Sequence, residues 1–92
     1  MIHNFRHKGL KGFFLTGSTA GINAKHSKKL ALILRRLHIA NAIDDMAVPS
    51  LGLHPLKGDM RGFWAVSVNG PWRIIFRFDE DGAYDVDYVN YH

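Results

Sequence analysis

Histidines are the side chains of this 92-residue chain best suited to acid–base chemistry, and the chain has six of them. It has no cysteine, so thiolate nucleophiles, thiolate zinc sites and iron–sulfur clusters are excluded. An imidazole, with an ordinary pKa of about 6.5, exchanges protons near neutral pH. His3 and His7 are four residues apart, but a strand is predicted to give way to a helix between them. With no carboxylate nearby, the histidine spacing therefore predicts no metal site.

Two histidines are distinguished by their position in the chain. His54 lies in the segment LHPLKGD, which is too rich in proline and glycine for a helix or a central strand, and functional side chains are often held in such loops. The alternative interpretation of His54 is a structural one, in which its imidazole forms a hydrogen bond with a backbone carbonyl. His92 directly follows a predicted strand, and the alternative to a functional role for it is that it belongs to a frayed chain end. We expect His26 and His38 to be solvated surface histidines.

Basic residues on a predicted strand are candidates for binding phosphate. Arg73 and Arg77 alternate with large apolar residues and therefore project from the other face of that strand. A guanidinium is suited to bidentate contact with a phosphate. The alternative is cross-strand ion pairing with Asp85 and Asp87 on the next strand. Lys57 in the LHPLKGD segment admits the same two interpretations.

The charge of the chain is unevenly distributed. The formal net charge is +4, but residues 1–48 carry eight basic against two acidic side chains, a net +6, whereas residues 49–92 carry four against six, a net −2. A basic half attracts polyanions such as nucleic acid, and an acidic protein partner would respond in the same way. The apolar runs are too short to span a membrane, and no apolar segment follows the first residues. We expect a cytoplasmic protein with no membrane partner.

The first half of the chain is predicted to be helical. Leu10, Phe13 and Phe14 have the spacing of one helix face, and Gly17 is placed to end that helix in a left-handed conformation. A longer helix is predicted over about residues 23–46, with its apolar stripe on one side and basic residues on the other.

The second half is predicted to form strands. Alternation predicts strands at 63–68, 72–78 and 84–89, with a shorter edge strand at 2–5 and an ordered loop or linker over 49–61. Asn69 and Gly70 indicate a hairpin, and Pro71 after them favours a turn longer than two residues. The predicted fold class is α+β, with two N-terminal helices packed on a small twisted antiparallel sheet, in a single domain that spans residues 1–92.

Several segments in order resemble the HigB toxins of bacterial toxin–antitoxin systems, within the RelE-like superfamily of small ribosome-dependent ribonucleases. The resemblance covers essentially the whole chain. It is carried by IHNFRHKGLK (2–11), LHPLKGD (53–59), GFWAV (62–66), WRIIF (72–76) and YVNYH (88–92). It implies a RelE-like fold, in agreement with the pattern of elements, and a catalytic site on a concave face of the sheet.

The resemblance also implies which residues act. It places His54, Asn90, Tyr91 and His92 in the catalytic cluster, and Lys57 and Arg73 as the basic residues that line it. The family typically has Asp at position 90, where this chain has Asn. An amide cannot exchange a proton at useful pH, so an acid or base role at that position is lost. The basic helices would contact the ribosomal RNA surface through Lys8, Lys11, Lys25, Lys28 and Lys29.

The implied function is cleavage of mRNA in the ribosomal A site by a toxin that a cognate HigA-like antitoxin holds inactive. Without metal or cofactor, such cleavage uses the RNA 2′-hydroxyl as the nucleophile, with a base, an acid and cations that stabilise the charge on phosphorus. Two histidines can share the acid and base roles. The first alternative is a catalytically weakened homologue that acts as a ribosome- or antitoxin-binding module. The second is a basic α+β domain whose histidines are incidental.

Overall fold

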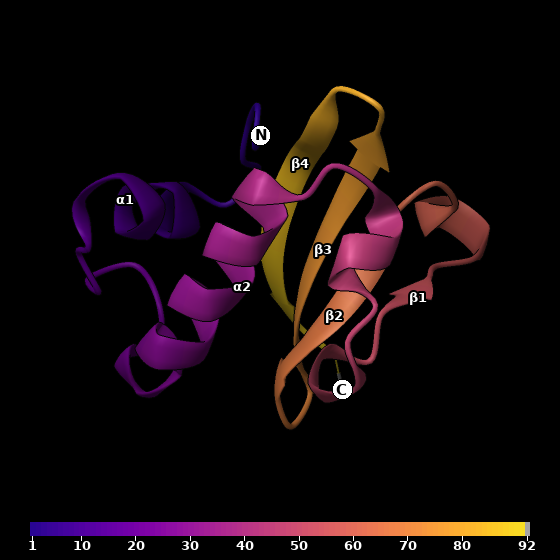
Figure 1. Cartoon of the computed structure of the whole chain (residues 1–92). Coiled ribbons are helices and arrows are strands. Elements are labelled where there is room, and N and C mark those ends of the chain that lie inside the picture. Colours follow the sequence, from indigo (N-terminus) through magenta and orange to yellow (C-terminus); the bar gives the residue numbers. More distant parts are fainter. Residues whose placement is uncertain (92) are drawn as a thin grey trace.

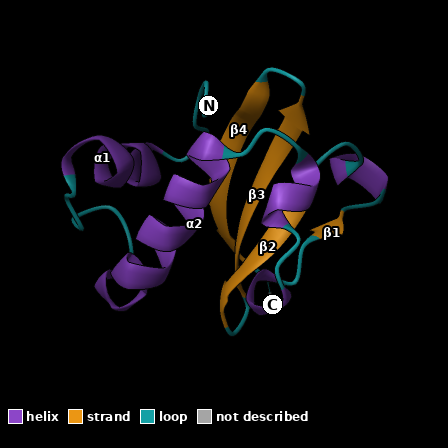
Figure 2. Ribbon diagram, in the orientation of Figure 1, coloured by secondary structure: helices purple, strands orange, loops and turns teal. Residues whose placement is uncertain are grey.

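Two helices and a four-stranded antiparallel sheet make up the fold, which a computed structural model describes for residues 1–91. The chain runs from the helices into the sheet, and the strand order in the sheet follows the sequence, β1-β2-β3-β4 (Figures 1 and 2). The helices are α1 (Lys8–Thr16) and α2 (Ser27–Ile39), and the strands are β1 (His54–Pro55), β2 (Trp64–Asn69), β3 (Trp72–Asp79) and β4 (Gly82–Asn90). This agrees with the predicted α+β class.

The first helix ends at Gly17, as its sequence predicts, and begins with a cap that the sequence does not predict. His7 precedes α1, and its Nδ1 accepts a hydrogen bond of 2.9 Å from the amide of Leu10, which satisfies one of the free N–H groups of the first turn. Gly17 ends the helix with φ at 81°, and its amide donates to the carbonyl of Phe13. This left-handed conformation suits glycine because glycine has no Cβ.

The second helix is shorter than predicted, and the expectation of one helix over 23–46 is wrong. α2 ends before Ala40, which is extended, and a separate 3₁₀ turn follows at Ile43–Met46. Between them the carboxylate of Asp45 accepts hydrogen bonds from the amides of Asn41 and Ala42. These bonds, with the nearby charge of Arg36, lower the pKa of Asp45. Aspartate here satisfies amides that a continuous helix would have paired with carbonyls.

The turn between β2 and β3 is shorter than predicted. Asn69 pairs with Trp72 across two residues, Gly70 and Pro71, so the expectation of a longer turn is wrong. Gly70 has φ at 54°. Glycine in a positive-φ conformation followed by proline, whose ring fixes a negative φ, is compatible with a two-residue type II′ hairpin turn.

A β-bulge interrupts the alternation of β4. Tyr84 pairs with Arg77 and Asp87 pairs with Ile75, so one extra residue is accommodated between them. Asp85, with φ at 53°, lies at this point, and Asn4 accepts a hydrogen bond from its amide. As a result Tyr84 lies on the opposite face of the sheet from Val86 and Tyr88, and the strict alternation expected for 84–89 is wrong.

The N-terminal segment joins the sheet through single bridges. Ile2 and Phe5 form isolated parallel bridges with Ala83 and Val86 of β4, where the sequence predicts a short edge strand. The segment thereby holds the outer edge of β4.

The main core lies between the helices and one face of the sheet. Leu30, Ile33, Leu34 and Leu37 of α2 pack in one buried cluster with residues of β2, β3 and β4, and α2 lies between α1 and the strands (Figure 1). A smaller buried cluster, Phe63, Ala65 and Ile75, lies on the other face of the sheet. The sheet therefore has one face covered by helices and one face available for a site.

Candidate active site

The face of the sheet away from the helices is covered at its centre and open at its ends. Ala65 and Ile75 point to this face but are buried, because Leu56 and Met60 from the segment between β1 and β2 pack against them. The open part nearer the β2–β3 turn contains Arg73, and Tyr91 is bonded to that turn. Its geometry follows from the strand register.

Four neighbouring backbone segments meet at this end of the sheet. Ser67 pairs with Arg73, which pairs with Val89. On the other side of Ser67, Gly52 lies so close that a Cβ added to it would be 3.6 Å from the Ser67 hydroxyl oxygen. Ser67 therefore lies between Gly52 and Arg73 on this face of the sheet.

His54 is exposed, and a backbone carbonyl holds its ring. Its Nδ1 lies 3.0 Å from the carbonyl oxygen of Gly52. A carbonyl only accepts hydrogen bonds, so Nδ1 must carry the proton. In the neutral ring Nε2 then has a free lone pair and is the atom that can accept a proton. The carbonyl bond that is the alternative to a functional role is therefore present, and it leaves Nε2 free.

Arg73 is half-buried and held by two carbonyls. Its Nη1 donates to the carbonyl oxygens of Gly70 (2.6 Å) and Trp72 (2.9 Å). The register places Val89, and not an aspartate, directly across from Arg73, and Asp87 directly across from Ile75. The register therefore gives Arg73 no directly opposite carboxylate, and two backbone bonds fix its guanidinium near the turn.

Arg77 is stabilised differently. It faces Tyr84 across the strands, and its guanidinium lies over the ring of Phe63, 5.4 Å from the centroid.

The remaining predicted catalytic residues lie at or beyond the end of β4. Tyr91 is 41% exposed, and its amide donates to the carbonyl of Pro71 (2.9 Å), which keeps it beside the β2–β3 turn. Asn90 is exposed and pairs with Trp72, so its position is on the helix-side face, opposite to Val89 and Arg73. His92 lies outside the described residues.

The basic residues expected to bind RNA are mostly free at the surface. Lys57 is exposed and precedes a 3₁₀ turn, Gly58–Met60. Lys29 is half-buried, and its Nζ donates to the carbonyl of Ser50 (3.3 Å), so part of its role is structural. The other helix-side lysines, Lys8, Lys11, Lys25 and Lys28, are exposed.

His26 is buried, and the expectation of a solvated histidine is wrong. It is 4% exposed at the end of a 3₁₀ turn, Ala24–His26, and its Nδ1 lies 2.6 Å from the hydroxyl of Tyr88. Trp72 stacks on Tyr88 and presents its ring edge-on to His26. Burial raises the pKa of the Tyr88 hydroxyl. This cluster lies on the helix side of the sheet and stabilises the fold.

His38 is exposed as expected, but it also accepts a hydrogen bond of 3.1 Å from the amide of Ile2.

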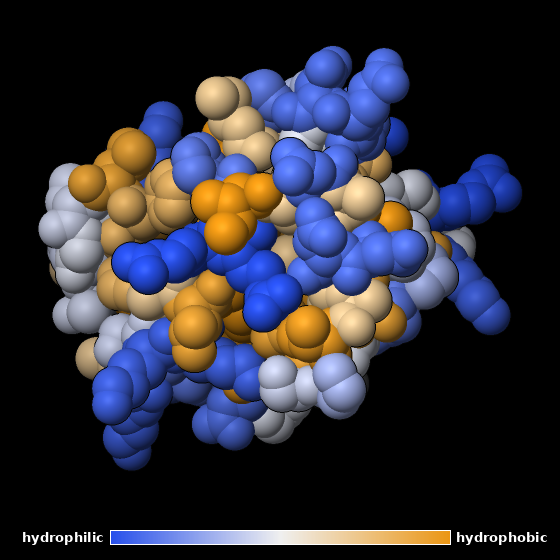
Figure 3. All heavy atoms as spheres, viewed as in Figure 1, coloured by the Kyte–Doolittle hydropathy of each residue, from blue (hydrophilic) through white to orange (hydrophobic). Residues whose placement is uncertain are grey.

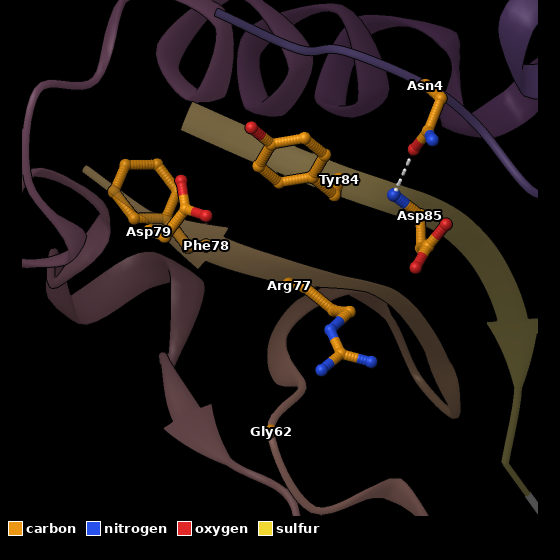
Figure 4. A pocket seen from close by; sticks show the side chains of 7 residues that line it. All are labelled: Asn4, Gly62, Arg77, Phe78, Asp79, Tyr84 and Asp85. Atoms are coloured by element: carbon orange, nitrogen blue, oxygen red, sulfur yellow. Dashed lines mark hydrogen bonds between the residues drawn. The ribbon is translucent and has the colours of Figure 1, made fainter. Parts of the chain in front are cut away.

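A hollow of about 400 Å³ lies at the opposite end of the same sheet face, where Arg77, Tyr84 and Asp85 line it together with Asn4 (Figure 4). Burial and the charges of Asp79 and Asp81 raise the pKa of Tyr84. Of the predicted phosphate-binding residues Arg77 lines this hollow, whereas His54, Lys57 and Arg73 do not. We place the candidate site between β1 and the β2–β3 turn, because the register puts His54, Ser67 and Arg73 on one face of the sheet there and Tyr91 is bonded to the turn.

Two residues of the site are not found by sequence reasoning. Gly52 orients His54 through its carbonyl and has φ at 56°, and Ser67 places a hydroxyl between His54 and Arg73. The one available signal was a lone serine in the apolar strand AVSV. Within residues 1–91, no three histidine or acidic side chains lie close enough to hold a metal ion, and no helix there is long and apolar enough to cross a membrane.

The chain is similar to known proteins over its whole length or nearly so. The chain is 39% identical to the Endoribonuclease HigB of Proteus vulgaris over 92 residues, which is the full length of both. Its fold is similar to that of a YoeB/ParE toxin from Agrobacterium tumefaciens, with a TM-score of 0.55 at 20% identity, covering 100% of this chain and 95% of that one. A family model for the RelE-like toxin of the type II toxin–antitoxin system HigB matches residues 3–92. The chain therefore belongs to the HigB-like family of RelE-like toxins.

Proposed function

We propose that this protein is the toxin of a type II toxin–antitoxin system and that it cleaves mRNA in the ribosomal A site. The observation that carries the proposal is the hydrogen bond of His54 to Gly52, which leaves Nε2 free on the face of the sheet that also carries Ser67 and Arg73. The family of the chain and the name of its Proteus vulgaris relative, an endoribonuclease, support the same reaction class.

In the proposed reaction the RNA supplies its own nucleophile. Nε2 of His54 removes the proton of a 2′-hydroxyl, the 2′-oxygen forms a bond to the adjacent phosphorus, and the bond from phosphorus to the 5′-oxygen breaks. The products are a 2′,3′-cyclic phosphate and a 5′-hydroxyl, which receives a proton from an acid. His92 and Tyr91 are the candidates for that acid. DNA lacks the 2′-hydroxyl and is not cleaved.

Arg73 and Lys57 supply positive charge where negative charge develops. Arg73 already has two backbone partners, which fix the guanidinium before substrate arrives. A fixed donor costs no reorganisation during the reaction, and such groups contribute about 3–4 kcal/mol to transition-state stabilisation in other enzymes. Tyr91 either stacks on a base or positions a hydroxyl. No step requires a metal ion.

The ribosome dependence is proposed to come from the helix lysines. The protein would act in the cytoplasm, because its proposed substrate is mRNA on the ribosome. Exposed Lys8, Lys11, Lys25 and Lys28 give the helical half its positive charge. Contacts of this kind with RNA phosphates supply affinity without sequence preference. A HigA-like antitoxin, acidic on its contact surface, would hold the toxin inactive.

Mapping of mRNA ends on purified ribosomes tests the proposal. We expect the wild-type protein to cut within the A-site codon and to leave the same RNA intact when ribosomes are absent. His54→Ala and His92→Ala should each reduce cleavage at least a hundredfold. His38→Ala is the control and should cleave normally, because His38 bonds the Ile2 amide beside β4, whereas His54 is on β1 at the other edge of the sheet. Full activity of His54→Ala would contradict the mechanism.

The second candidate is a toxin homologue that binds the ribosome or an antitoxin without cleaving. It is favoured by one observation, the amide of Asn90 where the family resemblance leads us to expect a carboxylate. Wild-type protein that sediments with ribosomes and leaves all mRNA ends unchanged would select this candidate.

A further inference from the structure

Three packed rings lie behind the β2–β3 turn, on the helix side of the sheet. His26 is buried, and its Nδ1 lies 2.6 Å from the hydroxyl oxygen of Tyr88. Trp72 stacks on Tyr88 with 4.6 Å between the ring centroids, and it meets His26 edge-on at 5.5 Å. Each ring therefore contacts the other two, and we call these three residues the His26 cluster.

The His26 cluster and the candidate site lie on opposite faces of the same strands. Trp72 and Tyr88 directly precede Arg73 and Val89, so their side chains project to the other face of the sheet. Figure 3, in the orientation of Figure 1, shows side chains packed over this face. His26 and Tyr88 are at most 5% exposed. Any influence of the cluster on a ligand must therefore pass through other residues.

The β2–β3 turn connects the His26 cluster to the candidate site. The carbonyls of Gly70 and Trp72 accept hydrogen bonds from Nη1 of Arg73. The carbonyl of Pro71, between them, accepts one from the amide of Tyr91. Three consecutive carbonyls thus hold two residues of the candidate site. A shift of Trp72 moves these carbonyls, and the guanidinium of Arg73 moves with them.

Trp72 is the side chain of the turn that packs against the core. Gly70 and Pro71 are exposed. The pairing of β2 with β3 is irregular between Ser67 and Asn69, just before the turn. Because a bulge disrupts the ladder locally, hydrogen bonds between these strands fix this end of the hairpin less firmly. The stacked ring of Trp72 therefore sets the position of the turn.

We infer that His26 is a positioning residue of the candidate site. By bonding Tyr88 it holds the ring on which Trp72 stacks. Trp72 in turn fixes the carbonyls that hold Arg73 and Tyr91. This inference rests on the proposed function, because it concerns residues proposed to act on RNA. A misplacement of about 1 Å can lower an enzymatic rate about a hundredfold, so a bond that touches no RNA contributes to cleavage.

Single-turnover cleavage of mRNA on saturating ribosomes measures this contribution. Tyr88→Phe keeps the stacking ring and removes only the hydroxyl that His26 bonds. We expect it to lower the cleavage rate constant about tenfold and to leave ribosome affinity within twofold of the wild type. His26→Leu should do the same. His26→Asn, whose amide can replace Nδ1 as the partner of the hydroxyl, should stay within about threefold of the wild type.

Two controls separate this effect from other consequences of the change. Tyr84→Phe is the same substitution at the other end of β4 and should cleave normally. Ile2→Val shortens a buried side chain that pairs with Ala83 beside the β3–β4 turn. It destabilises the fold far from the β2–β3 turn and should also cleave normally. Every variant is assayed under conditions in which circular dichroism shows it to be folded.

Two further measurements distinguish positioning from a loss of stability. The first is a double-mutant cycle with Arg73→Lys, because an ammonium group on a flexible stem lacks the fixed geometry of a guanidinium. Tyr88→Phe should lower the rate constant less than threefold in that background. The second is hydrogen exchange of the Tyr91 amide, which is bonded to Pro71. Tyr88→Phe should speed this exchange at least fivefold, and Ile2→Val should leave it unchanged.

The inference is overturned if Tyr88→Phe cleaves like the wild type, or if Ile2→Val slows cleavage as much as Tyr88→Phe does. A tenfold effect of Tyr88→Phe in the Arg73→Lys background would also overturn it, as would unchanged exchange of the Tyr91 amide. A wild-type protein that cleaves no mRNA would instead count against the proposed function. The exchange of the Tyr91 amide would then decide the inference by itself, since that measurement needs no substrate.

Discussion

His54 shows how much one side chain's role depends on a backbone atom that sequence reasoning does not find. The LHPLKGD segment marks the histidine as a candidate, but the tautomer follows only from the carbonyl of Gly52. That carbonyl is oriented by a glycine with φ at 56°, a conformation that few other residues adopt. The sequence therefore marks His54 as a candidate base, whereas the structure indicates which of its nitrogens is free to accept a proton.

Asn90 is the residue at which the chain departs from the family resemblance, and Asn90→Asp tests its effect. Asn90 is exposed at the end of β4, so a carboxylate there stays hydrated and should cost little stability. Because a carboxylate can exchange a proton, we expect cleavage on ribosomes to rise or at least to be maintained. The matched control is Asn69→Asp, an exposed residue that pairs with the same Trp72 from the other side. A loss of cleavage with Asn90→Asp but not with Asn69→Asp, in a folded protein, would show that the amide itself is required.

Tyr88→Phe tests the buried hydrogen bond of His26. Removing the hydroxyl leaves the Nδ1 of a buried ring without its partner, and this costs about 1–3 kcal/mol. We expect that decrease in the free energy of unfolding, measured by urea denaturation. Tyr84→Phe is the control, since Tyr84 is only half-buried and stacks on His3 through its ring, and it should change stability by less than about 0.5 kcal/mol. Equal effects of the two variants would contradict the role of the His26 bond.

The same tyrosines predict how stability depends on alkaline pH. Folding raises the pKa of Tyr88 and of Tyr84 above 10.0, so the unfolded chain loses these protons first. The contribution of these two tyrosines to the free energy of unfolding is fully present below pH 10 and is lost as the pH rises through their folded-state pKa values. We expect the urea midpoint to fall as the pH rises above 10, and Tyr88→Phe to reduce the slope of that fall. An unchanged slope in Tyr88→Phe would mean that other groups cause the alkaline loss.

At the scale of elements, local patterns predict most of the fold, and specific side-chain bonds account for the differences. The helix that ends at Gly17, the meander of strands and the outward face of Arg73 all follow from periodicity. The end of α2 does not, because the Asp45 carboxylate competes for amides of the next turn. The bulge at Asp85 and the burial of His26 depend on contacts with Asn4 and Tyr88, which are distant in the sequence.

The two glycines inside α1 are expected to behave oppositely, although both lower helix propensity. Gly9 lies against the backbone of Gly21, and a methyl group there would overlap the Gly21 carbonyl. Gly12 has open space where a methyl group would lie. We expect Gly12→Ala to raise the free energy of unfolding by about 1 kcal/mol, the difference in helix propensity. Gly9→Ala should lower it by about 1–3 kcal/mol, as overpacking does. Thermal unfolding of both variants decides this, and stabilisation by Gly9→Ala would show that the 17–23 loop moves away at little cost.

At the scale of the whole molecule, the net positive charge and the proposed catalytic residues lie in different halves of the chain. Residues 1–48 carry a net +6, whereas residues 49–92, which contain the proposed catalytic residues, carry a net −2. A protein that enters a narrow RNA-lined site needs contacts on more than one side. This distribution is consistent with helices that supply affinity and a sheet that supplies chemistry.

The salt dependence of ribosome binding tests that division of roles. Each phosphate contact made by a lysine adds about 0.9 to the slope of log K against log salt on duplex nucleic acid, and somewhat less on single strands. Replacing exposed Lys25 and Lys28 with Gln should therefore reduce the slope by about 1–2 and weaken sedimentation with ribosomes at moderate salt. Lys29→Gln is the graded control, because its ammonium group already contacts the Ser50 carbonyl, and it should change the slope less than Lys28→Gln. Cleavage by ribosome-saturating amounts of the Lys25/Lys28 variant should be normal, since neither residue lies near His54 in the fold. A slope that stays constant in all these variants would mean that the basic half serves a partner other than RNA.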